Sequence, residues 1–159
     1  MTGRLNKKTI IVTGAGSGLG RASALKLAEE DAQVFCVDIN PETVKETSDI
    51  ITSRGGVAYH YQADMCSETE IIAMVTEAEK TYNGIDGLLA NAGIAGTGAA
   101  HETSLEDWDR LIKVSLTGKW LCAKHVIPHF IAKKSGNIVF QSSICALNGF
   151  PKLVAYTAA

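Results

Sequence analysis

Thr13-Gly14-Ala15-Gly16-Ser17-Gly18-Leu19-Gly20 is a glycine-rich turn between an apolar, β-branched run at 8–13 and a segment with helical apolar spacing at 19–30. Glycines let the backbone approach a phosphate closely, and the first turn of a helix offers free N–H groups and the positive end of its dipole. The spacing Gly14-x-x-x-Gly18-x-Gly20 differs from G-x-G-x-x-G, but the strand-turn-helix context is the one that a dinucleotide-binding motif requires. We therefore predict that this turn binds a dinucleotide pyrophosphate. The alternative is a flexible turn without a ligand.

The same alternation of strand and helix continues along the chain. Apolar and β-branched runs predict five strands: 8–13, 33–38, 57–62, 85–90 and 137–142. Helical spacing and capping signals predict the segments between them: 19–30, 42–54, 68–82 and a long helix over 103–134, kinked at Pro128. The predicted fold is an α/β, doubly wound, Rossmann-like parallel sheet, with strands apolar enough to be buried on both faces.

Length and composition agree with one globular unit. The chain has 159 residues, of which 46% are hydrophobic and 20% charged. A domain of this size can bury a core without disulfide or metal staples. We therefore predict a single dinucleotide-binding domain over residues 1–159.

Asp38 closes the second predicted strand, eighteen residues beyond Gly20. A carboxylate at this place can accept hydrogen bonds from an adenosine ribose and repel a 2′-phosphate, which favours NAD over NADP. The alternative is an ordinary turn aspartate beside Asn40-Pro41.

These residues resemble the short-chain dehydrogenase/reductase family, whose motifs are T-G-x-x-x-G-x-G, then N-A-G, a serine and Y-x-x-x-K. Asn91-Ala92-Gly93 follows the fourth predicted strand, and Ser143 and Tyr156 lie thirteen residues apart, as in the family. Asp64 follows the third strand, where a family aspartate meets the adenine ring. The resemblance covers the whole chain and implies that the cofactor NAD is bound by Gly14, Ser17, Gly18, Leu19, Gly20, Asp38, Asp64, Asn91, Ala92 and Gly93.

The resemblance also implies an enzyme that moves a hydride between NAD(H) and a secondary alcohol or ketone. Tyr156 would exchange a proton with the substrate oxygen, and Ser143 would hydrogen-bond the same oxygen. The family usually carries an asparagine that holds a water of the proton relay, and Ser115 stands in its place. A serine hydroxyl can hold water but lacks the separate donor and acceptor of an amide.

The family's lysine would fall at position 160, one residue beyond Ala159. In the family this lysine holds the nicotinamide ribose and lowers the tyrosine pKa, and an ordinary tyrosine is only about 0.1% ionised at pH 7. We therefore expect a C-terminally truncated chain that lacks the final strands. Two alternatives stay open: a module that binds NAD without catalysis, and a fragment that binds nothing.

Other functions are disfavoured by charge and residue pattern. Fifteen basic and seventeen acidic residues give a net charge of −2, which provides no basic field for nucleic acid or anionic lipid. The first residues contain no apolar run of signal-peptide or membrane length, so we expect a cytoplasmic protein. The four cysteines are scattered without a C-x-x-C pair, so we expect no metal site. The expected partner is a small alcohol or ketone, and the resemblance implies a homo-oligomer at full length.

Overall fold

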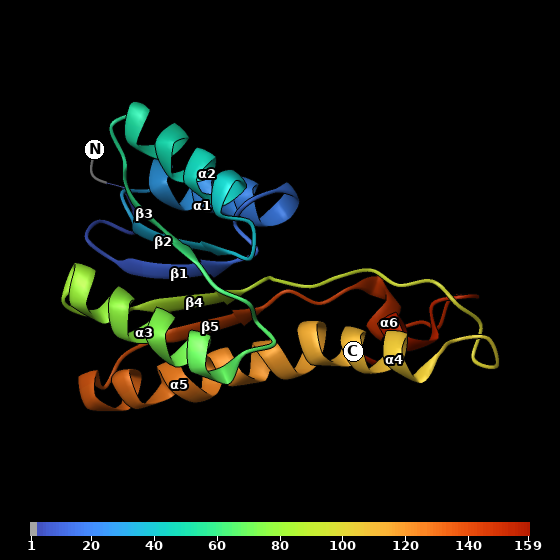
Figure 1. The fold of residues 1–159 in the computed structure, drawn as a ribbon. Helices are drawn as coiled ribbons and strands as arrows, with labels where there is room; N and C mark the ends of the chain where they lie inside the picture. The colour runs from blue at the N-terminus through green and yellow to red at the C-terminus, as the bar shows by residue number, and fades with distance from the viewer. Residues whose placement is uncertain (1–2) are drawn as a thin grey trace.

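The computed structural model describes residues 3–159 and contains one five-stranded sheet (Figure 1). The strands are β1 (Thr9–Thr13), β2 (Gln33–Asp38), β3 (Val57–Gln62), β4 (Gly87–Ala90) and β5 (Asn137–Phe140). Their order across the sheet is β3-β2-β1-β4-β5, and all four pairings are parallel. The central strand β1 places Val12 between Cys36 of β2 and Leu89 of β4.

Helices cover both faces of the sheet (Figure 1). The helices are α1 (Gly18–Glu29), α2 (Pro41–Ser53), α3 (Glu68–Tyr82), α4 (Leu105–Ile112), α5 (Gly118–Lys133) and α6 (Val154–Ala158). Two other helical segments are a π-helix over Lys113–Thr117 and a 3-10 turn over Ile144–Ala146. In Figure 1, α1 and α2 lie on one face, and α3 and α5 lie on the other. The predicted doubly wound, Rossmann-like fold is confirmed.

Successive residues of β1 point into two different cores, because side chains alternate between the faces of a strand. Val12 belongs to the core that α1 and α2 cover, together with Val34 and Val44. Ile11 belongs to the core under α3 and α5, together with Phe35. The inner strands are therefore apolar on both sides.

The expectation that every strand is buried on both faces is wrong for β3. Most residues of β3, and of β5 as the other outer strand, are exposed, including Tyr59 of β3 and Val139 and Phe140 of β5. The reason is position: β3 and β5 are the outer strands of the described sheet, where fewer side chains cover them. Apolar composition alone does not distinguish an outer strand from an inner one.

The long helix predicted over 103–134 is present as an unbroken helical stretch from Leu105 to Lys133, but its segment Lys113–Thr117, between α4 and α5, is π-helical. Pro128 lies inside α5, which continues to Lys133. A π-turn closes on the fifth residue instead of the fourth and so accommodates one additional residue. The apolar periodicity of a long sequence window does not reveal one inserted residue, so it does not predict the π-helical segment.

The chain reverses its direction of travel across the sheet between β1 and β4. β2 and β3 are added on one side of β1, and β4 and β5 on the other. At such a switch point the connections leave in opposite directions from the carboxyl ends of the strands and open a crevice between them. A ligand site is therefore expected at this edge of the sheet.

Asp86 joins three elements at the opposite edge of the sheet. Its carboxylate accepts hydrogen bonds from Lys8 Nζ at 3.0 Å, the Thr9 amide at 3.0 Å and Lys133 Nζ at 2.7 Å. Partial burial alone would raise the pKa of Asp86, but the hydrogen bonds from Lys133, the Thr9 amide and Lys8 outweigh it, so this pKa is lowered. The carboxylate thus fastens the start of β1 and the end of α5 to the residue before β4.

We expect Asp86→Asn to lower the free energy of unfolding by roughly 1–3 kcal/mol at pH 7, because it leaves two lysines without their charged acceptor. A lowered folded-state pKa contributes stability above the unfolded pKa of about 4 and loses it as the pH falls through the folded value. The difference between variant and wild type should therefore shrink in that acid range. Urea denaturation across pH measures it. Asp49→Asn, which breaks only the exposed Lys45–Asp49 pair, is the control. Equal stability of Asp86→Asn and wild type at pH 7 would contradict this role.

Candidate functional site

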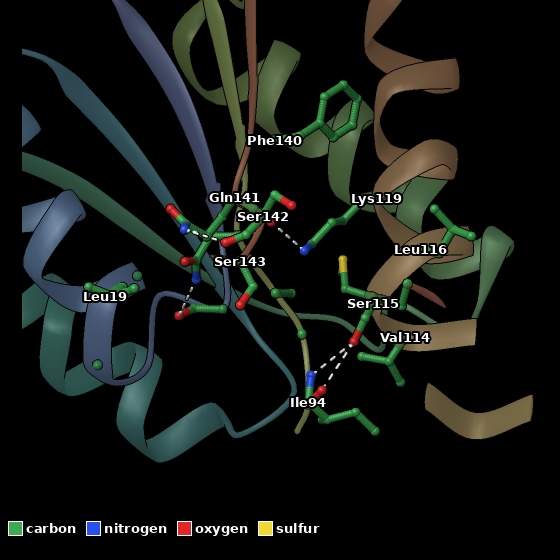
Figure 2. A pocket seen from close by; sticks show the side chains of 18 of the residues that line it. Leu19, Ile94, Val114, Ser115, Leu116, Lys119, Phe140, Gln141, Ser142 and Ser143 are labelled. Atoms are coloured by element: carbon green, nitrogen blue, oxygen red, sulfur yellow. Dashed lines mark hydrogen bonds between the residues drawn. The ribbon is translucent and has the colours of Figure 1, made fainter. Parts of the chain in front are cut away.

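A cavity of about 800 Å³ lies at the carboxyl ends of the strands (Figure 2). All of the residues predicted to form the site, except Asp64, line it: Gly14, Ser17, Gly18, Leu19, Gly20, Asp38, Asn91, Ala92, Gly93, Ser115, Ser143 and Tyr156. These residues come from the turns after β1, β2, β4 and β5 and from the helical segments on either side. The fold therefore brings together side chains that are far apart in the sequence.

The glycine turn is built so that two of its residues must lack a side chain. Gly14 has φ +68°, and a Cβ there would lie 2.9 Å from Ala92 Cα and 2.9 Å from Asn91 Nδ2. A Cβ on Gly20 would collide with the carbonyl of Gly14. Gly18 has φ +52° and faces open space. The first turn of α1 contains no acidic residue, so its N–H groups are available to an anion.

Thr13 ties the end of β1 to the end of β4. Its Oγ1 accepts hydrogen bonds from the amides of Asn91 and Ala92, each at 3.1 Å. The Asn91 side chain donates in return to the carbonyl of Thr13 at 3.0 Å and to that of Gly14 at 3.4 Å. The glycine turn and the Asn91-Ala92-Gly93 segment therefore form one rigid wall of the cavity.

Arg21 and Thr47 hold the other side of the turn, and sequence reasoning missed both. The Arg21 guanidinium donates to the carbonyl of Gly16 at 2.6 Å, to Thr47 Oγ1 at 3.0 Å and to Glu46 at 2.7 Å. Thr47 Oγ1 donates to the carbonyl of Ala15 at 2.9 Å. Because these contacts join α1 to α2, no short motif indicates them.

Asp38 lies at the end of β2 and faces the same turn. One of its oxygens accepts from the Gly16 amide at 2.9 Å, and the other accepts from the Asn40 amide at 3.1 Å. A Cβ on Gly16 would lie 2.9 Å from the Asp38 carboxyl group. The Asp38 carboxylate therefore lies directly against the glycine turn, at the carboxyl end of β2.

Asp64 is the one predicted site residue that does not line the cavity. Its neighbours Ala63 and Met65 line it instead, while the Asp64 carboxylate accepts a hydrogen bond from the Cys66 amide at 2.8 Å. The side chain stabilises the turn after β3. A contact of Asp64 with an adenine ring stays a prediction.

Ser143 and Tyr156 enter the cavity from two different segments. Ser143 precedes the 3-10 turn, and its Oγ accepts a hydrogen bond from the Cys145 amide at 3.2 Å. Tyr156 lies in α6, which is held by a bridge between Gly98 and Leu153. The loop that follows the Asn91-Ala92-Gly93 segment thus positions the helix that carries the tyrosine.

Ser115 lies buried in the π-helical segment. Its hydroxyl accepts from the Ile94 amide at 3.1 Å and lies 3.3 Å from the Ile94 carbonyl, to which it donates (Figure 2). These two contacts fasten the loop after β4 to the helix. A role for Ser115 in a proton relay stays a prediction.

Lys119 also lines the cavity and was not among the predicted site residues. Its Nζ donates to the carbonyl oxygen of Gln141 at 2.7 Å (Figure 2). Burial lowers the pKa of this ammonium below its ordinary value. The only sequence signal is its position one helical turn after Ser115, which places both side chains on the same side of the helix.

A family model described as short chain dehydrogenase matches residues 8–159. The chain belongs to the short-chain dehydrogenase family. It is 35% identical over its full length to 2-(S)-hydroxypropyl-CoM dehydrogenase 3 of Xanthobacter autotrophicus and 34% identical to cyclohexanol dehydrogenase of an Acinetobacter species, and covers 62% and 64% of these proteins. The chain therefore spans about three fifths of the length of the curated relatives it matches.

Two solved structures share the fold described above. An NAD+-bound xylitol dehydrogenase has a TM-score of 0.95 at 31% identity, over 98% of this chain and 60% of that one. A levodione reductase has a TM-score of 0.94 at 28% identity, over 98% of this chain and 61% of that one.

Within residues 3–159, no helix has the length and apolar character needed to span a bilayer. The same residues contain no cluster of three or more histidine, cysteine or acidic side chains that could hold a metal ion.

We expect Arg21→Met to loosen the glycine turn, because it removes the donors to Gly16 and Thr47. The amides of Ala15 and Gly16, which are hydrogen-bonded to Val37 and Asp38, should exchange with solvent about tenfold faster. Hydrogen exchange followed by NMR measures this. Arg54→Met, at the exposed end of α2, is the matched control and should leave both amides unchanged. Equal protection in the two variants would show that Arg21 does not hold the turn.

Proposed function

We propose that the protein is an NAD(H)-dependent oxidoreductase that transfers a hydride between the cofactor and a secondary alcohol or ketone. The observation that carries this proposal is that one cavity contains the glycine turn, Asp38, Ser143 and Tyr156. The first two suit the adenosine and pyrophosphate end of a dinucleotide, and the two hydroxyl groups suit a substrate oxygen. In this proposal residues 1–159 act as one dinucleotide-binding domain.

The residues present fit the cofactor. Gly14 and Gly20 keep open a cradle that a Cβ would fill, and Gly18 leaves free space at the start of α1. We assign the pyrophosphate to the turn from Gly14 to Gly20, and the adenosine ribose to Asp38. The chemistry that the dinucleotide supplies when bound is hydride transfer.

The side chains of this chain then handle the substrate oxygen. In reduction the Tyr156 hydroxyl donates a proton to that oxygen and becomes a phenolate, and in oxidation the Tyr156 phenolate accepts the proton of the alcohol. The Ser143 oxygen already accepts from the Cys145 amide, so its own proton is free to be donated to the substrate. Ser143 thus orients the oxygen and stabilises the charge that develops on it.

The finer parts of the proposal rest on the family and on Asp38. The NAD+-bound state of the related xylitol dehydrogenase and the carboxylate beside the glycine turn support NAD over NADP. Family membership supports a small-molecule substrate, a homo-oligomeric protein and a location in the cytoplasm.

We expect Asp38→Asn to narrow the preference for NADH over NADPH by about tenfold or more. The variant keeps an oxygen that can accept from the Gly16 amide but loses the charge that repels a 2′-phosphate. Fluorescence titration with both reduced cofactors measures the two Kd values. Asp49→Asn, on the exposed face of α2, should keep the wild-type ratio. An unchanged ratio in Asp38→Asn would remove Asp38 as the discriminating residue.

We expect Tyr156→Phe and Ser143→Ala to lower the rate of alcohol oxidation by at least a hundredfold, with the Kd of NADH changed less than threefold. Both variants remove a hydroxyl group that meets the substrate and leave the glycine turn intact. Stopped-flow oxidation of cyclohexanol or 2-butanol with NAD+, beside NADH titration, measures the two quantities. NADH binding without any turnover in the wild type would instead indicate a cofactor-binding module.

A further inference from the structure

Lys119 is the only lysine or arginine among the side chains that line the large cavity of the described structure. It lies in the first turn of α5 and is partly buried. Its Nζ is placed beside the segment that leaves β5, as Figure 2 shows. The contact to the Gln141 carbonyl at 2.7 Å has the length of a strong hydrogen bond from a charged donor.

Gln141 is the residue at which the chain leaves the sheet. Its amide donates to the carbonyl of Ala90 at 3.1 Å, which continues the pairing of β5 with β4 by one bond. Within residues 3–159 its own carbonyl accepts from the side chain of Lys119 and not from a strand. Ser142 and Ser143 follow directly, so the Lys119 ammonium is hydrogen-bonded to the backbone two residues before Ser143.

The preceding helical turn makes a similar contact with the loop that follows the neighbouring strand β4. Ser115 holds both the amide and the carbonyl of Ile94, which follows the segment after β4. Ser115 and Lys119 are four residues apart and lie on the same side of the helix. One stretch of helix thus fixes the chain exits of β4 and β5, and both exits form the wall of the cavity.

Within the described residues, the Gln141 carbonyl is the only hydrogen-bond partner of the Lys119 ammonium. No carboxylate within residues 3–159 lies within 4.0 Å of its Nζ, since the salt bridges of α5 involve Lys124, His125, His129 and Lys133. The carboxylates that α3 turns toward α5, Glu68 and Glu79, are used in those pairs. The other titratable groups of the cavity are Asp38, at the glycine turn, and Tyr156.

We propose that Lys119 is a positioning residue: its ammonium holds the Gln141 carbonyl and thereby places the Ser143 hydroxyl relative to the loop that Ser115 anchors. The kinetic consequence rests on the proposed function, whereas the structural consequence does not. Lysine suits this task because its long stem crosses from the helix to the strand exit, and its charge strengthens a single bond to a carbonyl.

The structural test compares Lys119→Met with Lys119→Arg. Methionine keeps the length of the stem but has no donor, while arginine keeps the charge and the donors. In Lys119→Met the amides of Cys145 and Ala146, which bond to Ser143, should exchange about tenfold faster than in the wild type. Lys119→Arg should restore their protection to within threefold. Lys124→Met is the control, because Lys124 lies on the same helix but pairs with Glu68 outside the cavity.

A titration of the wild type tests the same contact without a substitution. The carbonyl carbon shift of Gln141 and the amide shift of Cys145 should follow one transition as the ammonium loses its proton. Its midpoint should lie below 10.5, because burial lowers the Lys119 pKa. Lys119→Arg should show no such transition in this range, since the guanidinium stays charged. This measurement decides the question even if Lys119→Met fails to fold.

The kinetic test separates positioning from cofactor binding. Lys119→Met should lower kcat for alcohol oxidation about tenfold, leave the Kd of NADH within twofold of wild type and recover in Lys119→Arg. Unchanged exchange at Cys145 together with no titration at Gln141 overturns the inference, whatever the kinetics show. Absence of NADH binding in the wild type overturns the proposed function but leaves the exchange and shift measurements to judge Lys119.

Discussion

The hydroxyl of Thr13 accepts two backbone amides from the segment that follows β4, and the Asn91 side chain returns two hydrogen bonds to the backbone of β1. This exchange brings the glycine turn so close to the neighbouring strand exit that a side chain at position 14 has no room. The cavity depends on this close approach, because both the turn after β1 and the segment after β4 line it. Arg21 secures the outer side of the same turn, and the π-helical segment with α5 secures the strand exits beyond it.

The five strands, the turn and most of the cavity could be predicted from the sequence because each has a local signature. Continuous apolar and β-branched runs mark the strands, and a glycine at 14 or 20 marks a backbone that must lie close to another. Arg21, Thr47 and Lys119 have no such signature, since their partners come from other elements. The exposure of β3 and the π-helical segment also depend on neighbours that a single segment does not reveal.

Stability and chemistry are separated along the strands. Asp86 and its two lysines close the edge where the strands begin, while the cavity occupies the edge where they end. The two buried cores lie between these two edges of the sheet. A change at Asp86 therefore alters the free energy of unfolding with little effect on the arrangement of the cavity.

The segment Lys113–Thr117 holds one residue more than an α-helix would need to span the same distance. Such an extra residue is absorbed locally, so α5 keeps its face on the sheet and α4 keeps its packing against α6 whether it is present or not. Loss of one residue here would straighten the bulge and draw the Ser115 hydroxyl away from Ile94 while the surrounding packing stayed intact. Gain or loss of one residue in this segment can therefore change which side chains line the cavity while the buried core stays the same.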